Sequence, residues 1–297
     1  MTDYILLIVS AALFSLMFLF NRGYQRSRGE GLDSVLSFSV YSNLFIVIIL
    51  LILCLIGALS GWRGIFADFN LEFSVFSLLV SILGAAVGIG GAYFSIKALE
   101  SANLSLYSIF AMLGGMLLPS VCGIAFYGEP LTLPKLACYL LIVVSVALTF
   151  EKGKQSKKAI FCYFGVFVLN GMSGVVAQIH QGTPGVTAVN SNSFMIIKGA
   201  LTVAFCFIWF MIKYKGVPTL KLRECSGLTG YAACCGLGNL FVLIALLNLD
   251  ASVQYPIITG GTMFFSTVVS LIIGEKPSAR TLIAAVVAAA SSVLMML

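Results

Sequence analysis

Residues 159–197 read AIFCYFGVFVLNGMSGVVAQIHQGTPGVTAVNSNSFMII and contain no Asp, Glu, Lys or Arg. A soluble domain needs charge on its outer surface, and about a quarter of the residues in such domains are charged. A run of about 20 apolar residues is the length that crosses a bilayer once as a helix. This stretch therefore predicts two membrane helices, joined by the turn from His180 to Asn190.

The same pattern extends over the whole chain of 297 residues, which is 60% hydrophobic and 9% charged. Further uncharged stretches cover 34–62, 73–96, 101–128, 225–249, 251–274 and 281–297. Lipid offers no partner to backbone polar groups, which favours helices, and the runs lack the alternation of a barrel strand. We predict an all-α integral membrane protein with ten transmembrane helices. The predicted spans are 4–20, 35–59, 73–96, 104–127, 131–150, 159–179, 191–214, 227–247, 251–274 and 279–297.

Composition also excludes several classes of protein. No segment between the spans reaches the roughly 50 residues of a soluble domain. The net charge of +6 resides in short loops without interleaved aromatic residues, so it does not indicate nucleic-acid binding. The eight cysteines include no C-x-x-C pair, and a single histidine does not supply a Cys/His zinc site. We expect no metal and no cofactor.

The chain repeats itself after 146 positions. The identical pairs are Gly114 and Gly260, Gly115 and Gly261, Ser120 and Ser266, Gly128 and Gly274, and Glu129 and Glu275. Each half, 1–150 and 151–297, holds five predicted spans, and an odd number of spans makes the second copy enter the membrane upside down. Two inverted repeats are a recurring architecture of secondary transporters.

Positive charge is distributed unevenly over the connections between spans. The odd-numbered connections, counted with the span ends beside them, contain Arg22, Arg26, Arg28, Lys97, Lys152, Lys154, Lys157, Lys158, Lys213, Lys215, Lys221, Arg223, Lys276 and Arg280. The even-numbered connections, counted with the span ends beside them, contain only Arg63 and Lys135. Cytoplasmic loops of membrane proteins are enriched in Lys and Arg. We therefore predict a multi-pass protein of the cell membrane with odd connections in the cytoplasm and both termini outside it.

Four short segments resemble the EamA-type repeat of the drug/metabolite transporter superfamily. They are YFSIKAL at 93–99, GEPLT at 128–132, AL at 245–246 and GEKPS at 274–278. The resemblance covers essentially the whole chain. It implies a ten-helix transporter whose spans one, three, four, six, eight and nine line a central cavity. The sequence departs from the family in having Gly pairs where many relatives carry Glu-Pro in spans four and nine. Many relatives also keep their termini in the cytoplasm.

Lys198 is the first candidate for the substrate site. It lies about eight residues into a predicted span, or about 12 Å deep at 1.5 Å per residue. Ionisable residues inside a membrane are costly and are candidates for function. The lysine either faces a cavity and meets an anionic substrate group, or it caps helix carbonyls or reaches the interface. A basic residue at this place is also similar to the family pattern, and its counterpart in the first repeat is Asn43.

The other candidates are polar or aromatic residues within or beside the spans. The remaining predicted substrate-binding residues are Asn170, Asn239, Tyr93, Tyr107, Gln254 and Tyr255. For each amide, the alternative is a hydrogen bond between helices. His180 is either a proton site or a solvated loop histidine. The pairs Gly114-Gly115 and Gly260-Gly261 are either close helix crossings or hinges.

The leading functional prediction is a secondary transporter that moves a small polar metabolite by alternating access. No Asp or Glu lies within a predicted span, which disfavours a proton-coupled exporter of cations and favours neutral, zwitterionic or anionic substrates. The alternatives are a membrane receptor or partner subunit, or a channel. One histidine and no carboxylate within a span argue against an enzyme. A proton is a possible coupling ion.

Overall fold

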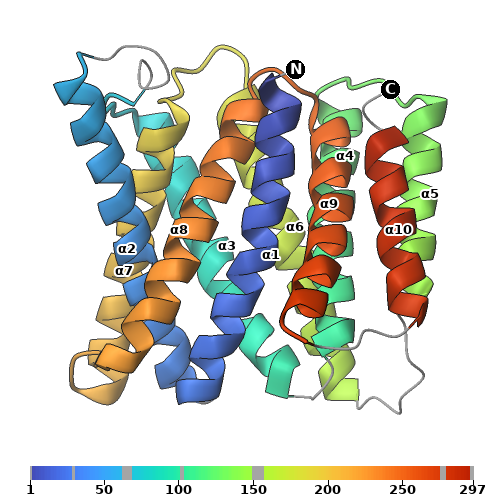
Figure 1. The fold of residues 1–297 in the computed structure, drawn as a ribbon. Helices are drawn as coiled ribbons and strands as arrows, with labels where there is room; N and C mark the ends of the chain where they lie inside the picture. Colours follow the sequence, from blue (N-terminus) through green and yellow to red (C-terminus); the bar gives the residue numbers. More distant parts are fainter. Residues whose placement is uncertain are drawn as a thin grey trace.

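The computed structural model describes residues 2–28, 31–61, 69–100, 104–148, 157–274 and 279–294, and these ranges form ten α-helices (Figure 1). The helices are α1 (Thr2–Arg28), α2 (Leu32–Leu59), α3 (Val75–Glu100), α4 (Leu104–Phe126), α5 (Leu133–Leu148), α6 (Lys157–Gly182), α7 (Ser191–Tyr214), α8 (Leu222–Ala245), α9 (Ala251–Ile272) and α10 (Ala279–Leu294). In the described part of the chain, each predicted span overlaps one of these helices. The prediction of an all-helical protein is confirmed for the described residues.

Seven of the described helices are long and apolar enough to cross a membrane: α1, α2, α3, α6, α7, α8 and α9. The apolar parts of α4, α5 and α10 are shorter, at Leu113–Phe126, Leu133–Ser145 and Leu282–Ser291. Large apolar side chains such as Leu59, Phe126 and Ile272 are exposed on the outside of the bundle, as lipid contact requires. Length, composition and this apolar exterior define a multi-pass helical membrane protein.

The helices pack in pairs drawn from distant parts of the sequence (Figure 1). Helix α1 packs against α8 and α9, α6 packs against α3 and α4, and α2 packs against α7 and α8. Helices α3 and α7 also meet, as do α4 and α9, while α5 and α10 pack together at one edge. Helix α1 begins and α10 ends at the same end of the bundle, which we call the terminal end.

Two helix crossings are so close that they require glycine. A Cβ atom on Gly114 would lie 1.9 Å from the backbone oxygen of Phe167, so α4 and α6 touch backbone to backbone. A Cβ atom on Gly261 would lie 2.9 Å from the Cβ of Ala11, where α9 meets α1. Small residues at helix interfaces permit such approach.

Two turns also use glycine for its backbone freedom. Gly128 after α4 has a φ of +69°, and Gly274 after α9 has a φ of +80°. Side-chain-bearing residues avoid this left-handed region. The two glycines are equivalent under the shift of 146 positions.

Candidate functional site

A cavity of about 410 Å³ lies within the bundle, lined by side chains from every helix except α5 and α10. The resemblance implied six lining spans; the structure adds α2 and α7. Tyr24 and Ser34 line one extreme of the cavity, next to the α1–α2 connection at the end opposite the terminal end. Phe194 and Tyr255 line the other extreme.

Lys198 of α7 lines this cavity and carries the only formal charge among its described lining residues. Its Nζ lies 5.8 Å from the centroid of the Phe194 ring. The aliphatic stem passes Gly84 of α3, where a Cβ atom would come within 3.0 Å of the lysine Cδ. Within the described part of the chain, no hydrogen bond or ion pair holds the ammonium, which is therefore available to a ligand.

Asn43, Asn170 and Asn239 all line the cavity, from α2, α6 and α8. Each uses its amide Nδ2 on a backbone carbonyl: that of Ser39 at 2.9 Å, Ala111 at 2.5 Å and Cys235 at 2.8 Å. A carbonyl only accepts hydrogen bonds, so the NH₂ group must be the side of each amide that faces it. The three Oδ1 atoms remain as acceptors for a ligand.

Tyr255 lines the cavity near the terminal end, where three helices meet. Its hydroxyl donates to the backbone oxygen of Gly174 at 3.1 Å. A Cβ atom on Gly174 would lie 2.4 Å from Pro119 Cγ and 2.9 Å from Tyr255 Cζ. This contact of α4, α6 and α9 limits the cavity on that side.

The structure places the other predicted substrate-binding residues elsewhere. Gln254 is fully buried, does not line the cavity and donates to the backbone oxygen of Val242. Tyr93 is 39% exposed, packs edge-on against Phe94 and also does not line the cavity. The side chain of Tyr107 lies outside the described residues. An apolar run does not reveal how a helix is rotated about its axis. The sequence therefore did not distinguish these residues from those that line the cavity.

The predicted glycine pairs occupy different surroundings. Gly115 lines the cavity beside Asn170, and its neighbour Gly114 lies at the α4–α6 crossing. Gly261 lies at the α9–α1 crossing, and Gly260 is buried.

His180 is fully buried, which rules out the alternative of a solvated loop histidine. It lies in the last turn of α6, where its ring stacks on Phe194 with 3.8 Å between centroids. Its Nε2 lies 3.0 Å from the Oγ of Ser77 on α3. The histidine lies close to the α6–α7 connection, as predicted, and Val189 of that connection donates to the same Ser77 Oγ.

Glu129 connects α6 and α9 at the terminal end, a role that its place at the end of a predicted span did not reveal. Its carboxylate accepts from the backbone N–H groups of Ala251 and Ser252 at 3.1 and 2.8 Å and from Gln178 Nε2 at 3.3 Å. It thereby caps the positive N-terminus of α9. Lys135 Nζ adds a 2.6 Å bond to Ser252 Oγ. The recurrence of Gly-Glu in both halves was the signal available in the sequence.

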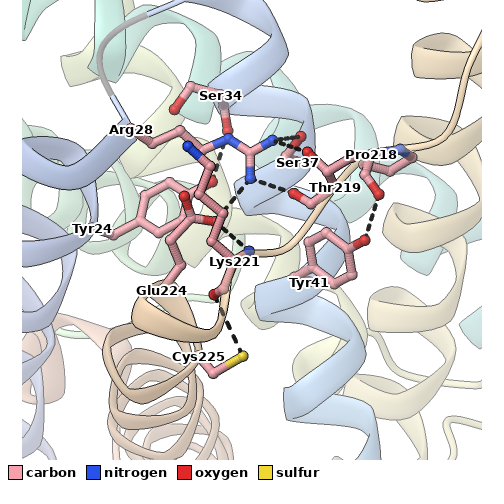
Figure 2. A network of polar contacts seen from close by, with 10 residues as sticks. All are labelled: Tyr24, Arg28, Ser34, Ser37, Tyr41, Pro218, Thr219, Lys221, Glu224 and Cys225. Atoms are coloured by element: carbon pink, nitrogen blue, oxygen red, sulfur yellow. Dashed lines mark hydrogen bonds and ion pairs between the residues drawn. The ribbon is translucent and has the colours of Figure 1, made fainter.

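A polar network borders the cavity at the opposite end (Figure 2). Arg28 of α1 pairs with Glu224 of α8 at 3.0 Å, and the Glu224 side chain is 1% exposed. Arg28 also bonds Ser37 at 3.1 Å, and Lys221 N donates to Glu224 at 3.1 Å. Burial raises the pKa of the neighbouring Tyr24 to about 12, against the opposing influence of Arg28, so its phenol is neutral at physiological pH.

Comparison with known proteins identifies the fold. No family model matches the chain, and no curated protein matches it. A solved structure described as "Crystal structure of protein" has a similar fold, with a TM-score of 0.72 and 16% sequence identity. The match covers 100% of this chain and 98% of the other. The same arrangement of helices therefore occurs in a solved protein of nearly the same length.

Proposed function

We propose that the chain is a secondary transporter that moves a small metabolite with an anionic group across the cell membrane by alternating access. The observation that carries the proposal is the unpaired Lys198 ammonium in a central cavity with no carboxylate among its described lining residues. A charge in a membrane interior is costly unless it meets a partner. A substrate anion supplies that partner.

Helix packing supports two inverted repeats, 1–150 and 151–297, with ten membrane crossings. In such a pair of repeats, α1 to α5 are equivalent to α6 to α10 in the same order. Exchanging equivalent helices converts the α1–α8 pair into α6–α3 and the α4–α6 pair into α9–α1. Both partner pairs occur. The same exchange turns α3–α7 into α8–α2, and it maps α2–α7, α4–α9 and α5–α10 onto themselves. This pattern is expected of a pseudo-two-fold and fits the resemblance to EamA-type drug/metabolite transporters.

The positions of the cavity and the closing contacts indicate one state of a transport cycle. The Glu129 and Tyr255 contacts hold α4, α6 and α9 together at the terminal end, whereas the cavity extends to Tyr24 and Ser34 at the other. The described helix ends that flank the basic connections, predicted to be cytoplasmic, lie at that other end. On this basis we assign the structure to an inward-facing state of the proposed cycle, in which rocking of the two repeats would open the terminal end.

The cavity chemistry narrows the substrate class. Lys198 offers one positive charge, and Asn43, Asn170 and Asn239 each offer an amide oxygen that accepts hydrogen bonds. A ligand with one acidic group and N–H or O–H donors satisfies both. Zwitterions and small organic acids with donor groups fit, whereas cations lacking an acidic group do not. The volume of about 410 Å³ suits a small metabolite.

A thermal-shift screen of the purified protein tests this assignment. A bound ligand raises the unfolding temperature by mass action. We expect stabilisation by zwitterionic or anionic metabolites and none by cationic analogues in which the acid is an amide. Stabilisation by the cationic analogues alone would contradict the assigned substrate class. A receptor or a partner subunit also binds ligands, so transport itself requires a flux measurement.

A further inference from the structure

His180 is the only histidine in the sequence, and its ring stacks with two phenyl rings. Its ring stacks on Phe194 at 3.8 Å with 19° between planes, and on Phe76 at 6.3 Å with 13° between planes. No part of the side chain is exposed. Three helices, α3, α6 and α7, therefore enclose a titratable group behind the cavity wall.

The hydrogen bonding of this imidazole is incomplete. Nε2 lies 3.0 Å from Ser77 Oγ, which also accepts from the backbone N–H of Val189 at 3.0 Å. Nδ1 is buried and has no hydrogen-bond partner in the described structure. Buried polar atoms nearly always have a partner, so an unsatisfied ring nitrogen calls for an explanation.

The charged groups around His180 do not favour an imidazolium. Lys198 of α7, the nearest cation, also contacts Phe194. The Glu72 carboxylate, just before α3, accepts from Asn190 N, and that of Glu129, after α4, accepts from Ala251, Ser252 and Gln178. Neither carboxylate bonds the ring. A buried charge without a paired partner is strongly disfavoured, so the closed terminal end holds His180 neutral.

We infer that His180 is the proton-binding site of the transporter, taking up a proton when the terminal end opens and losing it when that end closes. Opening separates α3 from the α6–α7 connection, which exposes Nδ1 and Ser77 to water. The inference rests on the proposed function, because it makes one end of an alternating-access cycle sensitive to pH; the proton returns on closure to the medium at that end, so it favours opening and is not carried across the membrane. Histidines within membrane segments are known elements of proton-linked transport.

The direction of the pH effect follows from linkage. The open form binds one more proton than the closed form, so acid favours opening and base favours closure. In the range where His180 takes up its proton on opening, the equilibrium constant for opening rises about tenfold per unit fall in pH. An acidic medium at the terminal end therefore drives the cycle toward the state open to that medium.

The experiment uses the full-length protein in nanodiscs, with an affinity tag free of histidine. Selective labelling of histidine then gives one imidazole NMR signal, which reports protonation. Hydrogen exchange at residues 186–190, corrected for intrinsic rates, reports loss of the Val189–Ser77 bond. We expect a neutral imidazole and slow exchange at pH 7.5. On acidification the imidazole should become protonated. Over the same pH range, the corrected exchange rate at residues 186–190 should increase by up to tenfold for each unit fall in pH.

Two variants make the result specific. His180→Gln keeps a donor or acceptor near Ser77 but does not titrate, and His180→Phe keeps the stack between Phe76 and Phe194. Exchange in both should lose its acid response. An imidazole that protonates without faster exchange, or an equal acid response in both variants, would overturn the inference. Because neither readout involves transport, a normal pH response without substrate flux would instead count against the proposed function.

Discussion

The functional prediction depends mainly on one side chain, that of Lys198. A lysine in an uncharged run is conspicuous in sequence, and the same is true of Asn43, Asn170 and Asn239. The structure places all four at one cavity. Gln254 and Tyr93 fitted the same criterion but do not line it, because composition gives the depth of a residue in a helix and not the direction that it faces.

Lys198→Ala should weaken ligand binding about 10- to 100-fold, since a hydrogen bond to a charged group is worth about 1.5–3 kcal/mol. The ligand-induced thermal shift measures this, with the unfolding temperature of the free protein as a check on folding. Lys213→Ala, an exposed lysine near the far end of α7, is the control and should bind normally. If Lys198→Ala and the wild-type protein bind the ligand with equal affinity, the lysine does not take part in ligand binding.

Gly84→Ala should weaken ligand binding severalfold, because the added methyl group displaces the Lys198 side chain. The new methyl would lie 3.0 Å from the lysine Cδ and 3.3 Å from Val176 Cγ1, so the lysine stem must move. Gly88→Ala is a matched control on the same helix and in the same cavity, with no atom within 4 Å of its Cβ. Ligand titration of both variants checks this; equal losses would show that the effect is not specific to Lys198.

At the scale of elements, the positions of the ten helices could be predicted because apolar length is a strong signal in a membrane protein. The sequence did not predict which helices pack against each other. The resemblance suggested six lining spans and omitted α2 and α7, although α7 carries Lys198. Glu129 and His180 illustrate the same limit: their roles come from partners more than 100 residues away in sequence, Ser252 and Ser77.

Gly114→Ala should destabilise the protein by about 1–3 kcal/mol or more, the usual cost of overpacking, because its Cβ collides with the Phe167 backbone. Thermal unfolding in detergent measures the loss. Gly23→Ala, in α1 with no atom within 4 Å of its Cβ, should be neutral or stabilising. If both variants unfold at the wild-type temperature, the α4–α6 crossing is looser than described.

At the scale of the molecule, the sequence repeat and the helix pairing suggest the same two halves. Both halves contain the sequence Gly-Glu, and its two glycines, Gly128 and Gly274, both have positive φ. The loop charges predict the orientation in the membrane, about which helix packing alone says nothing.

Reporter tags at the two ends of the chain should lie on the same face of the membrane, outside the cytoplasm. An even number of crossings requires a shared face, and the basic odd connections set which face it is. Accessibility of each tag in intact and permeabilised cells gives the answer. Tags on opposite faces would rule out the proposed pair of inverted five-helix repeats.

Counterflow in proteoliposomes tests transport most directly. Vesicles are loaded with the metabolite that gives the largest thermal shift, and a trace of the same labelled compound is added outside. A carrier with alternating access should accumulate label transiently above its equilibrium level in wild-type vesicles, and vesicles with Lys198→Ala should not. Uptake that rises only to equilibrium would indicate a channel, and binding without uptake a receptor; either result would contradict the proposed transporter.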